Sequence, residues 1–154
     1  MTRKYLWNHK LYIDSLFARS ESFQGKEEPL AHWTRYLCVL VSGWLETSVC
    51  DIIGDYTQKR SSGYVSHYVS QQLDKFWDPS MDKILALTCD FSPEWMKMLE
   101  EATKGEIKAA INSIVSQRNL IAHGESSSIS YEQLKKYYQK AIEGIQILES
   151  QCNK

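Results

Sequence analysis

The sequence predicts an all-α fold, a compact bundle of about five to seven helices. Its 154 residues include only seven glycines and three prolines, fewer than a chain rich in turns and short strands needs. Apolar residues make up 43% of the chain and recur at helical rather than alternating spacing. We find no credible strand, and the length suits one domain with a real core.

The N-terminal half is divided by few breaks. A helix is expected from Arg3 to about Arg19, followed by a polar loop over 20–28. Pro29 suits the first turn of the next helix, which runs to about Arg60 and is expected to form the centre of the core. The first helix should bury one stripe, made of Tyr5, Leu6, Leu11, Tyr12, Leu16 and Phe17.

Shorter helices follow the break at residues 61–63. They are expected over 64–77, ended by Asp78 and Pro79, and over about 81–89. Ser92 is a good N-cap for a helix over 93–103, and a helix over 106–123 should stop at Gly124. A capping box over 130–133 opens the last helix, which reaches about residue 151. We therefore expect one domain over 1–154, with its core over about 29–151 and an N-terminal helix and loop over 1–28.

Charge and composition exclude several classes of protein. The formal net charge of −1 excludes a strongly basic duplex-coating protein. No uninterrupted apolar run approaches the roughly 20 residues that span a bilayer, and no signal peptide is apparent, so no membrane contact is expected. The four cysteines form no C-x-x-C pair, which argues against a zinc site and favours reduced, buried thiols in a cytoplasmic protein.

One stretch carries groups with useful chemistry. Arg118 and His123 are five residues apart on one helix, so they differ by about 140° around its axis and about 7.5 Å along it. An arginine can hold a phosphate with its planar donor fork, and a histidine can transfer a proton near neutral pH. The alternative is an ordinary helix end, in which His123 complements the helix dipole and Gly124 takes the left-handed cap position.

The string from Arg118 to Gly124 resembles the R-x4-H motif of the HEPN superfamily. Further segments are similar to its RiboL-PSP-HEPN branch, and the resemblance extends over about residues 33–148. These segments are residues 43–46 (Gly-Trp-Leu-Glu), 81–85 (Met-Asp-Lys-Ile-Leu), 91–95 (Phe-Ser-Pro-Glu-Trp), and the serine-rich loop 126–128 before a helix with a Tyr-Tyr pair.

The resemblance implies a metal-independent endoribonuclease that needs no cofactor. Arg118 would bind and polarise the scissile phosphate of an RNA substrate, and His123 would act as general base or acid. The RNA 2′-hydroxyl would be the nucleophile and leave a 2′,3′-cyclic phosphate, so DNA would not be cut. Such proteins usually form homodimers with a composite active site, and many are toxins or phage-defence effectors with an antitoxin or a defence-system partner.

Five other residues are candidates for supporting roles. Asn119 would orient the phosphate or hold His123, and Glu46 would fix Arg118 or His123 by a charged hydrogen bond. Contacts to phosphate or RNA are further expected from Ser126, Ser127 and Lys135. For each of the last four, the alternative is an ordinary solvent-facing residue.

One departure and two competing interpretations stand beside this hypothesis. Relatives silenced by a nucleotidyltransferase antitoxin carry a modified tyrosine two residues after the motif histidine, where this chain has Glu125. Control by that modification is therefore not expected here. The competing interpretations are a non-catalytic HEPN-fold module for RNA or protein binding, and a structural helical adaptor within a larger defence complex.

Overall fold

The computed structural model describes the backbone of residues 3–154 and the side chains of residues 6–154. This part of the chain is 83% helical and contains no strand, so the predicted all-α fold is confirmed. Tyr5, expected in the first apolar stripe, has a side chain that lies outside the described ones. The elements are α1 (Arg3–Arg19), a 3-10 helix η1 (Ser20–Phe23), α2 (Glu27–Arg60), α3 (Gly63–Leu73), α4 (Met81–Phe91), α5 (Pro93–Thr103), α6 (Glu106–Ala122) and α7 (Tyr131–Cys152).

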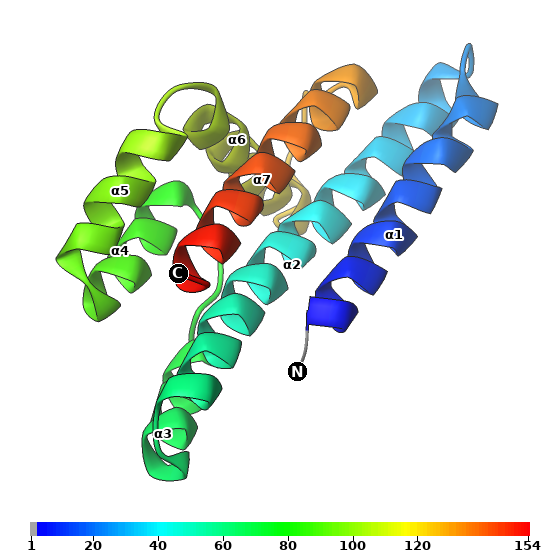
Figure 1. Ribbon diagram of the computed structural model, residues 1–154. Coiled ribbons are helices and arrows are strands. Elements are labelled where there is room, and N and C mark those ends of the chain that lie inside the picture. Colours follow the sequence, from blue (N-terminus) through cyan, green and yellow to red (C-terminus); the bar gives the residue numbers. More distant parts are fainter. Residues whose placement is uncertain (1–2) are drawn as a thin grey trace.

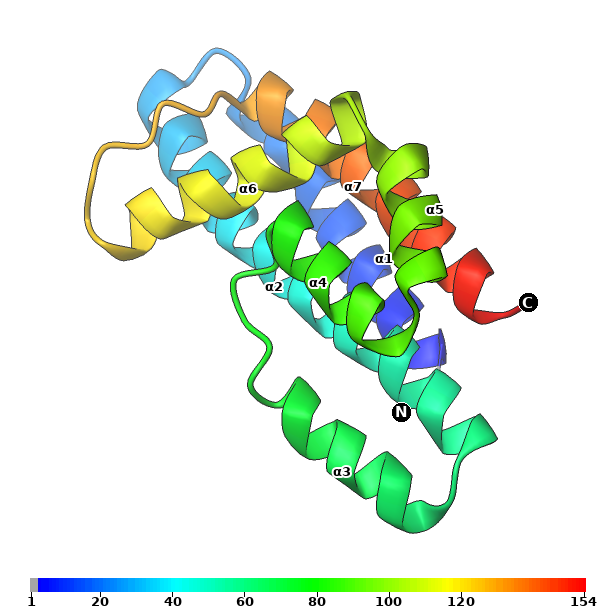
Figure 2. The same cartoon turned by 90° about the vertical axis from the view of Figure 1, so that its left-hand side faces the viewer.

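Helix α2 is the central element of the bundle. It runs the length of the molecule and contacts α1, α3, α6 and α7 (Figures 1 and 2). Its buried side chains recur every three or four residues, the spacing of one helix face. Trp44, which is 1% exposed, stacks on Tyr138 of α7 with ring centroids 5.7 Å apart. Apolar burial between these two long helices therefore forms the middle of the core.

Helix α1 joins this core with a different set of residues from the one expected. Leu6, Ile13 and Leu16 are buried, and Phe17 is half-buried. Leu11 and Tyr12 are exposed, so their place in the buried stripe was wrong. Ile13 takes the inward position because α1 lies lengthwise along α2, and only one narrow face of α1 meets the rest of the bundle.

Helix α3 ends four residues earlier than expected, at Leu73. Asp74 caps it, and the amides of Lys75 and Phe76 bond to the carbonyls of the last turn instead of continuing the helix. Residues 74–80, which we name the α3–α4 connector, then run back along α2 to the start of α4 (Figure 2). This early end places Trp77 and Asp78 in a loop rather than in a helix.

The length and composition of α2 would also allow it to cross a membrane, which the search for uninterrupted apolar runs did not predict. More than half of the relevant window is buried inside the bundle. The core helix of a soluble protein meets the same criteria, so this observation is weak evidence for a membrane span. The burial of α2 against four other helices explains its apolar composition.

Candidate functional site

The motif lies at the C-terminal end of α6, which ends in a Schellman cap. His123 is the C-cap residue, and its amide donates to the carbonyl of Asn119 at 3.1 Å. Gly124 adopts φ +69°, and the amides of Gly124 and Glu125 bond to the carbonyls of Ile121 and Leu120. The helix-cap interpretation of His123 and Gly124 is therefore correct in geometry. It leaves the His123 imidazole exposed and available for another role.

A chain of hydrogen bonds links Arg118 to two other elements. Arg118 Nη1 donates to Asn119 Oδ1 at 3.2 Å, and Asn119 Nδ2 donates to Asp78 Oδ1 at 2.8 Å. The amide of Asp78 in turn donates to Glu46 Oε2 on α2 at 3.3 Å. These four residues, Glu46, Asp78, Asn119 and Arg118, are half-buried, and we refer to them as the Arg118 network. The network fixes the guanidinium through three separate segments of the chain.

Arg118 keeps a free positive charge within this network. In the described side chains, 6–154, no carboxylate lies within ion-pair distance of its guanidinium. Its hydrogen-bond partner among these side chains, the Asn119 oxygen, is neutral. A guanidinium has five N–H donors, so most of its donors remain available for an anion. The geometry of such a fork matches a phosphate or a carboxylate.

The α3–α4 connector and the start of α4 are each held against α6 by one hydrogen bond. Besides the bond from Asn119 to Asp78, the Oδ1 of Asn112 accepts from the amide of Met81 at 2.9 Å. Asn112 and Asn119 are seven residues apart, two helical turns, so they share one face of α6. Asp78 has φ +60°, in the left-handed region that aspartate tolerates better than most residues. This connector therefore has a defined conformation beside the motif.

A family model described as RiboL-PSP-HEPN matches residues 3–154, nearly the whole chain. The chain belongs to the RiboL-PSP-HEPN family. The resemblance found in the motif and its flanking segments is thus confirmed. No curated protein and no solved structure matches the chain. A HEPN domain suggests an RNA-related function, often that of a ribonuclease.

The structure of this HEPN domain separates the supporting candidates. Asn119 contacts Arg118 and Asp78 with its side chain, and holds His123 only through its backbone carbonyl. Glu46 bonds the amide of Asp78, and no direct bond joins it to Arg118 or His123 within residues 6–154. Asn119 therefore supports Arg118 directly, and its side chain does not hold His123. Glu46 supports Arg118 only through Asp78 and Asn119, instead of by the direct hydrogen bond expected.

The remaining candidates lie in two places. Ser127 Oγ donates to Gln117 Oε1 at 2.7 Å, which folds the serine-rich loop back onto α6 just before the motif. Ser126 is exposed in the same loop. Lys135 lines a hollow between α1 and α7 with Asp14 and Glu21, so the structure places it among groups of the α1–α7 face. Ser126 and Ser127 remain near the motif, whereas Lys135 is not in contact with the Arg118 network.

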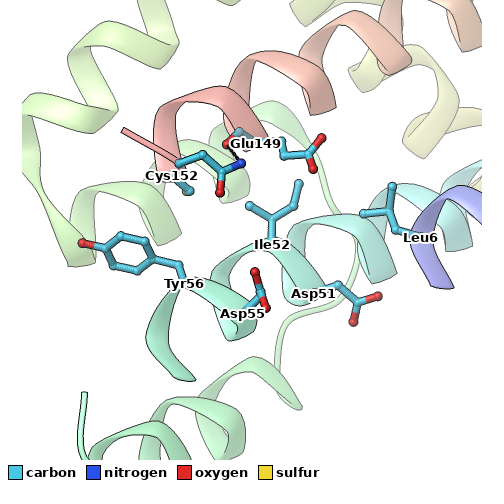
Figure 3. A pocket seen from close by; sticks show the side chains of 8 residues that line it. Leu6, Asp51, Ile52, Asp55, Tyr56, Glu149 and Cys152 are labelled. Carbon is cyan, nitrogen blue, oxygen red and sulfur yellow. Dashed lines mark hydrogen bonds between the residues drawn. The ribbon is translucent and has the colours of Figure 1, made fainter. Parts of the chain in front are cut away.

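A second hollow lies between α1, α2 and the end of α7 (Figure 3). Three carboxylates, Asp51, Asp55 and Glu149, line it, so its charge disfavours a phosphate. Figure 2 shows the end of α6 on the opposite side of the molecule from the C-terminus, and so from this hollow. Among the described residues, no group of three or more His, Cys, Asp or Glu side chains is placed to hold a metal ion.

Three of the four cysteine thiols are unsuited to nucleophilic chemistry. All four are free; Cys38 and Cys152 are buried, whereas Cys50 and Cys89 are only half-buried. Burial raises the pKa of Cys38 to about 12 and that of Cys152 to about 11. Burial and then the charge of Glu46 raise the pKa of Cys50 to about 12. These three thiols stay protonated near neutral pH, so they contribute packing rather than catalysis.

Sequence patterns did not lead to Asp78 or Asn112 as residues of the site. Asp78 and Pro79 were interpreted only as a helix stop, because a loop residue shows no periodicity that reveals its neighbours. The contact of Asp78 with Asn119 spans 41 residues. A weak signal was available, since an Asp-Pro pair is a common site of a tight turn with unusual backbone angles.

Proposed function

We propose that this domain is a metal-independent endoribonuclease in which Arg118 and His123 act on the same phosphodiester. The observation that carries the proposal is the free, half-buried guanidinium of Arg118, held by a neutral acceptor at the helix end that also presents His123. Family membership supports RNA as the substrate class.

The reaction is an internal transesterification. His123 accepts the proton of the RNA 2′-hydroxyl, and the 2′-oxygen attacks the neighbouring phosphorus. The P–O2′ bond forms while the P–O5′ bond breaks, and the departing 5′-oxygen takes up a proton. The products are a 2′,3′-cyclic phosphate and a 5′-hydroxyl. Arg118 stabilises the negative charge that increases on the phosphoryl oxygens in the transition state.

We propose that the active form is a homodimer with a composite site. In one chain, the exposed His123 imidazole has no side-chain partner among residues 6–154 that would fix its ring. A general base needs such orientation, and a second copy of the motif would supply it. A cytoplasmic toxin or phage-defence effector, with an antitoxin or another defence protein as partner, is the biological role that the resemblance favours.

The decisive experiment is an RNA cleavage assay in EDTA with the wild type, Arg118→Ala and His123→Ala. Two matched controls change the same residue types outside the motif: Arg60→Ala at the end of α2 and His32→Ala, which is exposed near the start of α2. Light scattering confirms that all five proteins have the same oligomeric state. We expect cleavage with cyclic phosphate ends by the wild type and both controls, and at least a hundredfold loss in the two motif variants.

Cleavage that persists unchanged in His123→Ala would contradict the proposal, as would cutting of an RNA with 2′-O-methyl groups at every position. RNA binding by a folded dimer without cleavage would favour the second candidate, a non-catalytic HEPN-fold RNA-binding or protein-interaction module. The incomplete surroundings of His123 in a single chain are the observation that keeps this candidate open to test.

A further inference from the structure

Trp77 differs from the other tryptophans in its exposure. Trp44 is 1% exposed, and Trp7, Trp33 and Trp95 are half-buried and packed against the core. Trp77 is 65% exposed and lies in the α3–α4 connector. A single exposed ring is not unusual on a protein surface, so the contacts of Trp77 decide whether it has a role.

The ring of Trp77 is held by Lys83, from the first turn of α4. Lys83 Nζ lies 4.3 Å from the ring centroid and donates to the Trp77 carbonyl at 3.2 Å. The same ammonium lies 3.6 Å from Asp78 Oδ2. The cation covers one ring face, and no other ring or cation stacks on Trp77 within residues 6–154. Trp77 is therefore an oriented ring with an open face.

The Arg118 network is connected to the segment that carries this ring. Trp77 directly precedes Asp78, and two hydrogen bonds lead from Asp78 through Asn119 to Arg118. Consecutive Cα atoms are about 3.8 Å apart, so ring and guanidinium are attached to one small frame. Glu46 also holds the connector, and Asn112 holds the first residue of α4, so the backbone that carries Trp77 is held at both points before any ligand binds.

We propose that Trp77 is a stacking platform for an unpaired nucleobase adjacent to the phosphate held by Arg118. An aromatic face next to a guanidinium fork matches the two parts of a nucleotide, the flat base and the charged phosphate. The bases of a duplex are already stacked and cannot reach the ring, so the preferred substrate class is single-stranded RNA or a loop.

This inference rests on the proposed function only in taking RNA as the ligand of Arg118. The test uses a fluorescently labelled single-stranded RNA with 2′-O-methyl groups throughout, which cannot be cleaved by 2′-hydroxyl attack. Its affinity is measured by anisotropy for the wild type, Trp77→Ala, Trp77→Phe and Tyr64→Ala. Tyr64, on α3, is 92% exposed and is the matched control for loss of an exposed aromatic ring.

Loss of one stacking contact should weaken binding by about 5- to 150-fold in Trp77→Ala. Trp77→Phe keeps a ring and should recover most of the affinity, and Tyr64→Ala should bind as the wild type does. A series of the same RNA with one abasic position each adds a thermodynamic cycle. At one position of the RNA, removal of the base should lower the affinity of the wild type by a similar factor and leave the affinity of Trp77→Ala unchanged.

Three results would overturn the inference: no binding of the RNA by the wild type, unchanged affinity in Trp77→Ala, or a Trp77→Ala loss that is equal for every abasic RNA. A lower dimer fraction in Trp77→Ala, together with an affinity loss that does not depend on the base removed, would also overturn it and would assign Trp77 to a subunit interface.

Cleavage of unmodified RNA is assayed on the same preparations. Base-dependent binding without cleavage refutes the proposed nuclease alone, and cleavage with the same KM in Trp77→Ala refutes the platform alone.

Discussion

Asn119 Nδ2 donates a 2.8 Å hydrogen bond to Asp78 Oδ1, across 41 residues of sequence. This contact determines which way the Asn119 amide points. A carboxylate accepts only and a guanidinium donates only, so the amide nitrogen must face Asp78 and the amide oxygen must face Arg118. The carboxylate thereby orients Arg118 through a neutral group. A direct ion pair would instead use donors of the arginine fork and neutralise the charge that a phosphate needs.

Asp78→Gly should lower kcat/KM for RNA cleavage by about tenfold or more. The substitution removes a charge-assisted hydrogen bond, and such bonds contribute about 1.5–3 kcal/mol. Glycine accepts φ +60° without strain, so the backbone of the connector should keep its conformation. Asp78→Asn keeps both the backbone preference and an Oδ1 acceptor, and should retain most of the activity. Cleavage kinetics of the three proteins measure these differences.

A purely structural role for Asp78 would give a different pattern. In that case Asp78→Gly and Asp78→Asn would change thermal stability in parallel with activity. A thermodynamic cycle with Arg118→Ala distinguishes a purely structural role of Asp78 from a role through Arg118. Its readout is the affinity for uncleavable single-stranded RNA. If Asp78 acts through Arg118, Asp78→Gly has no further effect on affinity in the Arg118→Ala background. Asp82→Asn, at an exposed carboxylate that pairs with Lys108, is the control for loss of one negative charge on α4.

Two glycines inside helices should respond to alanine in opposite directions. Gly43 of α2 is exposed, and a Cβ there would meet nothing within 4 Å. Gly43→Ala should raise the free energy of unfolding by about 0.5–1 kcal/mol through helix propensity. A Cβ at Gly144 of α7 would lie 3.0 Å from Ile107 Cγ2 and 3.1 Å from Ile111 Cδ1. Gly144→Ala should therefore lower the free energy of unfolding by about 1 kcal/mol, because overpacking against α6 outweighs the gain in helix propensity.

Urea unfolding at neutral pH measures both variants against the wild type. An equal rise in the free energy of unfolding of both variants would show that α6 and α7 can move apart without cost, contrary to the close packing at Gly144. The comparison also reports on assembly, because Gly43 lies on an exposed part of α2. A Gly43→Ala protein that is stable but no longer forms the wild-type oligomer would place this part of α2 in a subunit interface.

Local sequence signals predicted most of the fold because they act within one element. The helix caps involve residues within a few positions of each other. They are the Ser92 N-cap, the capping box of Ser130 and Gln133, and the cap at Gly124. Helix starts and stops were accordingly close to those observed. The early end of α3 was missed because the apolar residues Phe76 and Trp77 continue its periodicity, while the chain must turn back toward α6.

The candidate site was predictable only in its linear part. Arg118, Asn119 and His123 stand together in one motif, and α6 presents them as one helix end. The partners that orient Arg118 come from α2 and from the α3–α4 connector, whose contacts depend on tertiary packing. Glu46 was chosen by resemblance and is connected to the site, but through the amide of Asp78. Lys135 was chosen by proximity in sequence, and α7 carries it toward α1 instead.

Tyr138 and Asp14 form the polar contact that should make the fold sensitive to alkali. Tyr138 is 1% exposed, and its hydroxyl donates to Asp14 Oδ1 at 2.8 Å, while Lys10 Nζ lies 2.6 Å from Asp14 Oδ2. Burial, then the hydrogen bond and the charge of Asp14, raise the pKa of Tyr138 well above its ordinary value of 10.0. The unfolded chain therefore loses this proton at a lower pH than the folded one.

The sign of the effect follows from proton linkage. A raised folded pKa gives a contribution to stability that is fully present below about pH 10 and is lost as pH rises above it. Cys38 and Cys152, with pKa values of about 12 and 11 against 9.0 for an ordinary thiol, add a similar loss from about pH 9 upward. Tyr138→Phe should cost about 1 kcal/mol at pH 7 through the lost hydrogen bond, and should show a shallower decline between pH 9.5 and 11. Urea unfolding at pH 7 and between pH 9.5 and 11, under reducing conditions, measures the loss of stability and the slope of its decline with pH. An unchanged slope in Tyr138→Phe would mean that Tyr138 ionises as readily in the folded protein as in the unfolded chain, against the buried contact with Asp14.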